Sequence, residues 1–139
     1  RQGLGPDFRE DLVEHGLFTM ASGAAAATRL FERSPDIDGI FVASDLMALG
    51  AISVIRQLGK RVPDDVAIVG FDDIELASMA EPSLTTIRQR TENQGRLMAR
   101  LLLRQLGHEV DDVESEPAPS TPDGRGIVQH VDLIERESA

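Results

Sequence analysis

The residues best suited to chemistry in this sequence are two adjacent carboxylates, Asp72 and Asp73, which directly follow the apolar run at 67–71. An ionised carboxylate accepts hydrogen bonds and donates none, so it suits a ligand that presents hydroxyl or ring N–H groups. The alternative is structural, because an Asp after a strand often caps the next turn. A second polar pair, Ser44 and Asp45, follows another apolar run, and either side chain can cap the helix after it while the other faces a ligand.

Other kinds of site have little support. The three histidines, His15, His108 and His130, show no metal-ligand spacing, and the sequence has no cysteine. It contains no glycine-rich phosphate loop and no nucleophile–histidine–acid set. Adjacent carboxylates point in different directions, which does not suit hydrolysis by paired carboxylates. We therefore predict a protein that is not an enzyme, with no catalytic residue, metal or cofactor. A small Mg²⁺-dependent α/β enzyme that uses Asp72 and Asp73 is the alternative from another class.

The polar pairs need strands to position them, and the hydrophobic pattern predicts these. Apolar runs predict strands at 37–43, 66–69, 84–89 and 127–134, and helix-forming runs predict helices at 8–14, 22–33, 46–58 and 91–106. Strands that alternate with helices indicate a parallel α/β sheet flanked by helices. Ligands bind such sheets outside the carboxyl ends of the strands, where both polar pairs are expected.

The helix predicted at 46–58 is apolar around nearly its whole circumference. Such a helix is buried on more than one side. One side packs on the sheet, and in a chain of 139 residues the other side favours a second subunit.

Composition limits the class of partner. The formal net charge of −10 repels phosphate backbones, so this chain is not expected to grip nucleic acid. No apolar run has the length of a membrane span, and the first residues show no signal pattern. Without cysteine a reducing compartment fits, and we predict a cytoplasmic protein. The acidic, proline-rich stretch at 109–124 predicts an exposed loop.

Three blocks in order resemble the effector-binding core of LacI/GalR-type bacterial transcription regulators: "GIFVASDLMALGAI" (39–52), "RVPDDVAIVGFDDIELA" (61–77) and "PSLTTIRQ" (82–89). The resemblance implies a truncated type I periplasmic-binding-protein-like lobe. Residues 1–89 and 125–139 would form the C-terminal lobe, and residues 90–108 a helix of the N-terminal lobe. Most of that lobe and the DNA-binding headpiece would be absent, so operator DNA is expected as a partner only through the missing headpiece. A sugar-binding protein of an ABC transporter is the alternative with the same fold.

The resemblance also implies roles for single residues. The expected effector is a sugar, sugar phosphate or nucleobase-like molecule in the cleft between two lobes. Asp72 would accept hydrogen bonds from its hydroxyls or amines, Gln89 would border it at the crossover, and Phe18 would stack on it. Ser44, where the family commonly has Asn, and Asp45 complete the predicted effector set.

Two departures from the family pattern accompany these matches. Leu4 stands where the family has an anchoring arginine, and the strand normally found before the aromatic is missing, so that Leu17 adjoins Phe18.

Family members form homodimers through this lobe, using the helix and loop that match 45–58 and 74–81. The predicted residues at the two-fold contact are Leu49, Ile52, Ser53, Met79 and Ala80.

Overall fold

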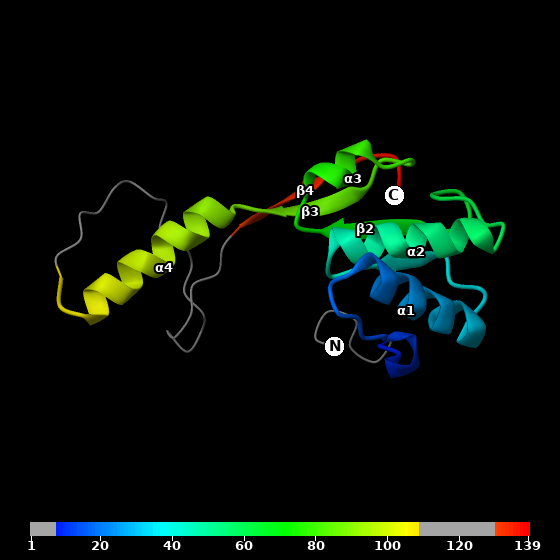
Figure 1. Cartoon of the computed structure of the whole chain (residues 1–139), viewed down its shortest axis with the longest axis horizontal. Coiled ribbons are helices and arrows are strands. Elements are labelled where there is room, and N and C mark those ends of the chain that lie inside the picture. The colour runs from blue at the N-terminus through cyan, green and yellow to red at the C-terminus, as the bar shows by residue number, and fades with distance from the viewer. Residues whose placement is uncertain (1–7, 109–129) are drawn as a thin grey trace. The chain divides into compact units, whose positions relative to one another are not determined.

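The computed structural model describes residues 8–108 and 130–139, and within them helices and strands alternate as the sequence predicts (Figure 1). In chain order the elements are η2 (Glu10–Leu12), α1 (Met20–Arg33), β1 (Gly39–Phe41), α2 (Asp45–Gln57), β2 (Ala67–Phe71), α3 (Glu75–Met79), β3 (Thr85–Gln89), α4 (Thr91–Gln105) and β4 (Val131–Ile134). The strands form one sheet in the order β1-β2-β3-β4, with β1 parallel to β2 and β2 parallel to β3. The predicted α/β class is therefore confirmed.

The chain divides into two compact units. The first contains everything up to Arg88 together with Leu133–Ala139, and the second is Gln89–Asp132. β3 thus leads out of the first unit and β4 leads back into it. The prediction of an exposed loop at 109–124 lies outside the described residues.

The predicted helix at 8–14 is wrong in extent. Only the three residues of η2 form a 3₁₀ turn, between extended backbone at Arg9 and Val13, and no side chain caps it. A stretch this short cannot repay helix nucleation without tertiary packing. By contrast, α1 begins two residues before the predicted start, because the Thr19 hydroxyl accepts from the Ser22 N–H and the Ser22 hydroxyl accepts from the Thr19 N–H.

The core of the first unit lies between α2 and the strands. Its largest wholly buried apolar side chains are Ile55, Ile68, Leu84 and Val66. Burial alternates along β2, so that Ile68 faces the core while Val69 is half-buried. α2 buries residues on several sides, since it packs on the sheet and against α1.

Two glycines let α1 and α2 approach closely. A Cβ atom at Gly50 would lie 2.0 Å from the carbonyl oxygen of Met20, and one at Gly23 would lie 2.1 Å from that of Met47. These distances are far below van der Waals contact, so no larger residue fits either position without moving a backbone.

The last residues return to the amino ends of β2 and β3. Ser138 is wholly buried, its N–H donates to the Ser83 carbonyl at 3.0 Å, and its carbonyl accepts from the Ile68 N–H at 2.8 Å. Its hydroxyl donates to the Ile68 carbonyl at 2.6 Å and accepts from the Thr85 N–H at 2.9 Å. A tail distant in sequence thereby joins the two strands.

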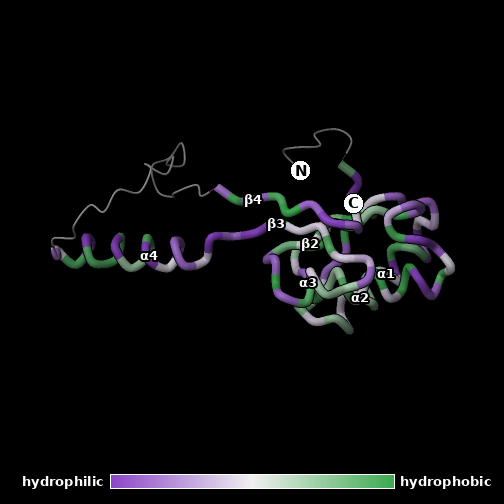
Figure 2. Tube along the Cα trace, turned by 90° about the horizontal axis from the view of Figure 1, so that it is seen from above, coloured by the Kyte–Doolittle hydropathy of each residue, from purple (hydrophilic) through white to green (hydrophobic). Residues whose placement is uncertain are grey.

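In the second unit, α4 alternates hydrophobic and hydrophilic residues along its length (Figure 2). None of its residues is buried. Its apolar side chains are instead exposed to solvent, with Met98 at 68% and Leu102 at 57%.

Candidate functional site

Neither Ser44 nor Asp45 caps α2 through its side chain, because Ser44 makes no capping hydrogen bond and the Asp45 carboxylate bonds residues outside the helix. Asp45 is wholly buried at the start of α2, where its Oδ1 accepts from the Thr86 hydroxyl at 2.6 Å and its Oδ2 from the Ile74 N–H at 2.9 Å. Its carboxylate therefore ties α2 to β3 and to the segment before α3, and this geometry weighs against direct contact with a ligand. Ser44 as a residue is 5% exposed, and its hydroxyl makes no hydrogen bond to any described residue.

Sequence reasoning missed the residues that hold Asp45. Thr86 supplies the hydroxyl, and Gly70 supplies the space, because a Cβ atom there would lie 2.2 Å from Asp45 Oδ1. A glycine within the apolar strand of β2 was the available signal, since glycine inside a strand often marks the close approach of another group.

Asp72 and Asp73 also differ from each other. Both have positive φ, 106° and 53°, a region that few non-glycine residues occupy and that clusters at functional sites. Asp72 is exposed, and its N–H donates to the Ile87 carbonyl at 2.9 Å. The strained turn thus holds the Asp72 side chain at the carboxyl end of β2.

Asp73 turns inward and forms a charge cluster. Its side chain is 7% exposed and pairs with Arg88 Nε at 2.6 Å and an Arg136 guanidinium nitrogen at 2.7 Å. Burial alone raises the pKa of Asp73, but the hydrogen bonds and charges of Arg136 and Arg88 outweigh it and hold that pKa below its ordinary value. Asp73 therefore serves as the ion-pair partner of two arginines and does not cap the next turn, since no side chain caps α3.

The structure brings the two predicted polar pairs together. The hydrogen bond from Ile74 to Asp45 places the start of α2 beside the turn that carries Asp72 and Asp73. Two aromatic residues that the sequence analysis did not single out end the neighbouring strands. Phe41 of β1 and Phe71 of β2 meet edge to face with ring centroids 6.4 Å apart, and Phe41 is 63% exposed.

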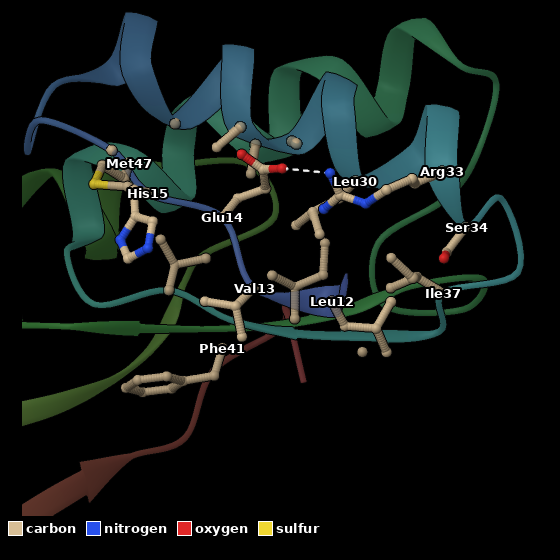
Figure 3. Close-up of a pocket in the computed structure, with 18 of the residues that line it drawn as sticks. Leu12, Val13, Glu14, His15, Leu30, Arg33, Ser34, Ile37, Phe41 and Met47 are labelled. Carbon is tan, nitrogen blue, oxygen red and sulfur yellow. Dashed lines mark hydrogen bonds and ion pairs between the residues drawn. The ribbon is translucent and has the colours of Figure 1, made fainter. Parts of the chain in front are cut away.

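Of the other two predicted effector residues, Phe18 belongs to the first unit and Gln89 to the second. Phe18, with φ of 57° and 65% exposure, lines a cavity of about 940 Å³ beside α1 (Figure 3), and neither Ser44 nor Asp72 lines that cavity. Gln89 ends β3 and belongs to the second unit, where its Oε1 accepts from Gln94 Nε2 at 3.2 Å.

A separate groove lies on α2 and α3. It has a volume of about 670 Å³, and its lining includes all five residues predicted for a two-fold contact: Leu49, Ile52, Ser53, Met79 and Ala80. Met79 is 72% exposed. The groove therefore offers apolar surface to solvent in the isolated chain.

Neither a metal cluster nor a membrane span is found in the part of the chain that the structure describes. No three His, Asp or Glu side chains among residues 8–108 and 130–139 are grouped to hold an ion. No helix in these ranges is long and apolar enough to cross a bilayer.

Comparison with known proteins gives consistent matches. Residues 2–138 match the family described as "Periplasmic binding protein-like domain". The transcriptional regulator CelR of Thermobifida fusca is 49% identical over 108 residues, which are 78% of this chain and 32% of that protein. The repressor PurR of Proteus mirabilis is 32% identical over 130 residues, 94% of this chain and 35% of that protein. This chain thus spans about a third of the length of these relatives, which are regulators rather than enzymes.

Solved structures agree. A CelR–cellobiose complex superposes with a TM-score of 0.79 at 42% identity, covering 99% of this chain and 39% of that one. A LacI family regulator from Arthrobacter in complex with lactose has a TM-score of 0.65 at 31% identity, covering 86% and 41% respectively.

Proposed function

This chain belongs to the LacI family of transcriptional regulators, and from this premise we propose that it is the effector-sensing and dimerisation region of such a regulator. We propose a sugar of the cellobiose class as the effector. The observation that carries this choice is the CelR–cellobiose complex, which matches 99% of this chain at 42% identity.

The chemistry at the strand ends supports a sugar. Asp72 presents an exposed carboxylate that can accept hydrogen bonds from sugar hydroxyls, and the Ser44 hydroxyl has no partner among the described residues. Phe41, which ends the neighbouring strand β1, offers an exposed aromatic ring, and aromatic side chains are common in ligand sites. The sugar would lie against this surface, in the cleft that the family forms with a second lobe.

We assign α4 to that second lobe. In support, none of its residues is buried and its apolar side chains are exposed, as expected of a helix whose packing partner lies outside the described residues. An effector that binds the closed arrangement of the lobes more tightly than the open one would shift the population toward closure. Closure of the lobes would then reposition the DNA-binding headpieces of the regulator on operator DNA. The net charge of −10 supports DNA contact through a headpiece rather than through this chain, and we place the protein in the cytoplasm.

We further propose that a second copy of the chain covers the groove on α2 and α3. All five residues predicted from the family resemblance line it, and its exposed Met79 and Leu76 would be buried by a two-fold partner.

The effector proposal is tested by titration calorimetry of the intact protein with cellobiose, lactose, maltose and ribose. We expect cellobiose to bind, and Asp72→Asn to weaken that binding about tenfold or more, because the variant loses a charged acceptor. Asp64→Asn is the matched control, since Asp64 is an exposed aspartate before the amino end of β2. If none of the four sugars produced binding heat, the proposal that the effector is a sugar would be contradicted. Unchanged affinity in Asp72→Asn would remove Asp72 from the site.

A further inference from the structure

The turn that carries the Asp72 carboxylate is strained at two successive residues. Asp72 has φ of 106° and Asp73 has φ of 53°. Residues other than glycine rarely occupy this region, and such strain persists only where the surrounding structure holds the backbone in place. The contacts that hold this turn therefore determine where the exposed Asp72 side chain lies.

Anchors act on three successive residues of the turn. The Asp72 N–H donates to the Ile87 carbonyl at 2.9 Å, and the Ile74 N–H donates to Asp45 Oδ2 at 2.9 Å. Between these two backbone anchors, the turn is held through the side chain of Asp73. On its amino side Asp72 is thus tied to β3 by its own backbone, and on its carboxyl side its position depends first on Asp73.

Two arginines fasten the Asp73 side chain to β3. Arg88 Nε donates to Asp73 Oδ2 at 2.6 Å and Arg136 Nη2 donates to Oδ1 at 2.7 Å, so each carboxylate oxygen has its own arginine. Arg136 is itself held at the start of β3, where its Nη1 donates to the Leu84 carbonyl at 2.7 Å and its backbone N–H to Thr85 Oγ1 at 2.9 Å. Arg88 lies near the other end of the same strand.

The two arginines differ in how much of the fold depends on them. The Arg136 side chain is 17% exposed, whereas that of Arg88 is 51% exposed. Loss of the Arg88 cation leaves Asp73 paired with Arg136, and ion pairs with an exposed partner contribute little to global stability. A change at Arg88 should therefore free one side of the Asp73 carboxylate and loosen the turn while the domain stays folded.

We propose that Arg88 is a positioning residue for the effector: by fastening Asp73 to β3, it holds the neighbouring Asp72 carboxylate where it accepts hydrogen bonds from the sugar. This inference rests on the assignment of Asp72 to the sugar site. A carboxylate that is already held in its binding orientation loses less freedom when the ligand binds, and the affinity rises accordingly. Arg88 acts through the turn and needs no contact with the sugar.

The test is a double-mutant cycle on the intact protein, with cellobiose affinity measured by titration calorimetry. We expect Arg88→Gln to weaken binding about fivefold in the parent, but less than about twofold in the Asp72→Asn background, because the two residues act through one another. Arg88→Lys should restore binding to within about twofold of the parent, since a lysine ammonium can also pair with one carboxylate oxygen.

Arg61→Gln is the matched control. Arg61 is likewise an exposed arginine that pairs with aspartates, Asp64 at 2.9 Å and Asp65 at 3.0 Å, but it precedes the amino end of β2 rather than following its carboxyl end. Arg61→Gln should bind cellobiose like the parent. Circular dichroism melts verify that every variant folds.

Hydrogen exchange followed by NMR gives a second readout that needs no sugar. The Asp72 amide, which bonds the Ile87 carbonyl, should exchange about threefold faster or more in Arg88→Gln, because local opening of the turn becomes easier. The Ala48 amide, which bonds the Ser44 carbonyl at the start of α2, should exchange at the rate of the parent.

Equal loss of affinity in both backgrounds would overturn the proposal, because Arg88 would then act independently of Asp72. Unchanged affinity in Arg88→Gln, with a clear loss in Asp72→Asn, would overturn the positioning role alone. If cellobiose did not bind, or bound Asp72→Asn as tightly as the parent, the proposed sugar site would fail instead. The exchange rate would then decide whether Arg88 holds the turn, and an unchanged rate of the Asp72 amide would overturn it.

Discussion

Asp45 and Asp73 are both buried carboxylates, but the protein satisfies them by different means. Asp45 accepts from a hydroxyl and a backbone N–H, which bring no formal charge. Asp73 meets two guanidinium groups, and Arg136 is itself only 17% exposed. Removing one member of a buried charged pair is costly because the remaining charge stays desolvated. The cluster around Asp73 therefore makes stability depend on pH.

Acidification should remove the contribution of Asp73. Its folded-state pKa lies below its ordinary value of 3.8, so the stabilisation is present above that value and is lost as pH falls through the folded pKa. We expect Asp73→Asn to be less stable than the parent at neutral pH, with a difference that narrows as pH falls below about 4. Urea unfolding at several pH values measures this difference. Asp64→Asn, which alters an exposed ion pair, should differ little from the parent in stability. If the difference in unfolding free energy between Asp73→Asn and the parent were as large in acid as at neutral pH, the stabilising role assigned to ionised Asp73 would be contradicted.

At the scale of elements, the contact between α1 and α2 depends on the absence of side chains at its closest points. Gly50 faces the Met20 carbonyl, which belongs to the first turn of α1 and cannot rotate away as a flexible side chain could. The distance between the two helices is therefore set by Gly50 and Gly23.

Gly50→Ala should destabilise the protein. The added Cβ would lie 2.0 Å from the Met20 carbonyl oxygen, and overpacking of this kind costs about 1–3 kcal/mol. Gly95→Ala, on α4, is the control, because a Cβ there meets no atom within 4 Å and alanine is the better helix former. The midpoints of urea unfolding are measured for both variants and for the parent. Equal midpoints for Gly50→Ala and the parent would show that the helices separate without cost.

Helices and strands could be predicted from the sequence where a long periodic pattern determines them. They were harder to predict where contacts with residues distant in sequence determine them. The helix at 46–58 and the strand ends at Asp72 and Ser44 follow from local apolar runs. The extent of η2 does not, because seven residues carry too little pattern to outweigh tertiary context. The partners of the buried carboxylates were also missed. Thr86 is 41 residues from Asp45 and Arg136 is 63 from Asp73, and a single sequence has no local signal for such pairs.

At the scale of the whole molecule, the groove on α2 and α3 predicts a homodimer. Leu49 is half-buried in the isolated chain, so an aspartate there keeps access to water until a partner covers it. We expect Leu49→Asp to shift the protein from dimer to monomer, because the dimer would bury an unpaired charge. Leu58→Asp is the control, since Leu58 follows the same helix, is 52% exposed and does not line the groove.

Sedimentation equilibrium of the parent and both variants decides this point. A parent that is monomeric, or a Leu49→Asp variant that dimerises as tightly as the parent, would refute the proposed interface.

The return of Ser138 to β2 and β3 also bears on how the protein is made. Ile68 and Thr85 are synthesised well before Ser138. In the folded first unit, however, the backbone N–H groups of Ile68 and Thr85 both donate hydrogen bonds to Ser138. The amino ends of β2 and β3 therefore lack these hydrogen bonds until the whole intervening segment and Ser138 have been synthesised. Closing that segment costs little more if it lengthens, because loop entropy grows only logarithmically with length. Synthesis from the amino end thus delays completion of the first unit. Insertions between Gln89 and Asp132, by contrast, can accumulate during evolution at small cost to the stability of that unit.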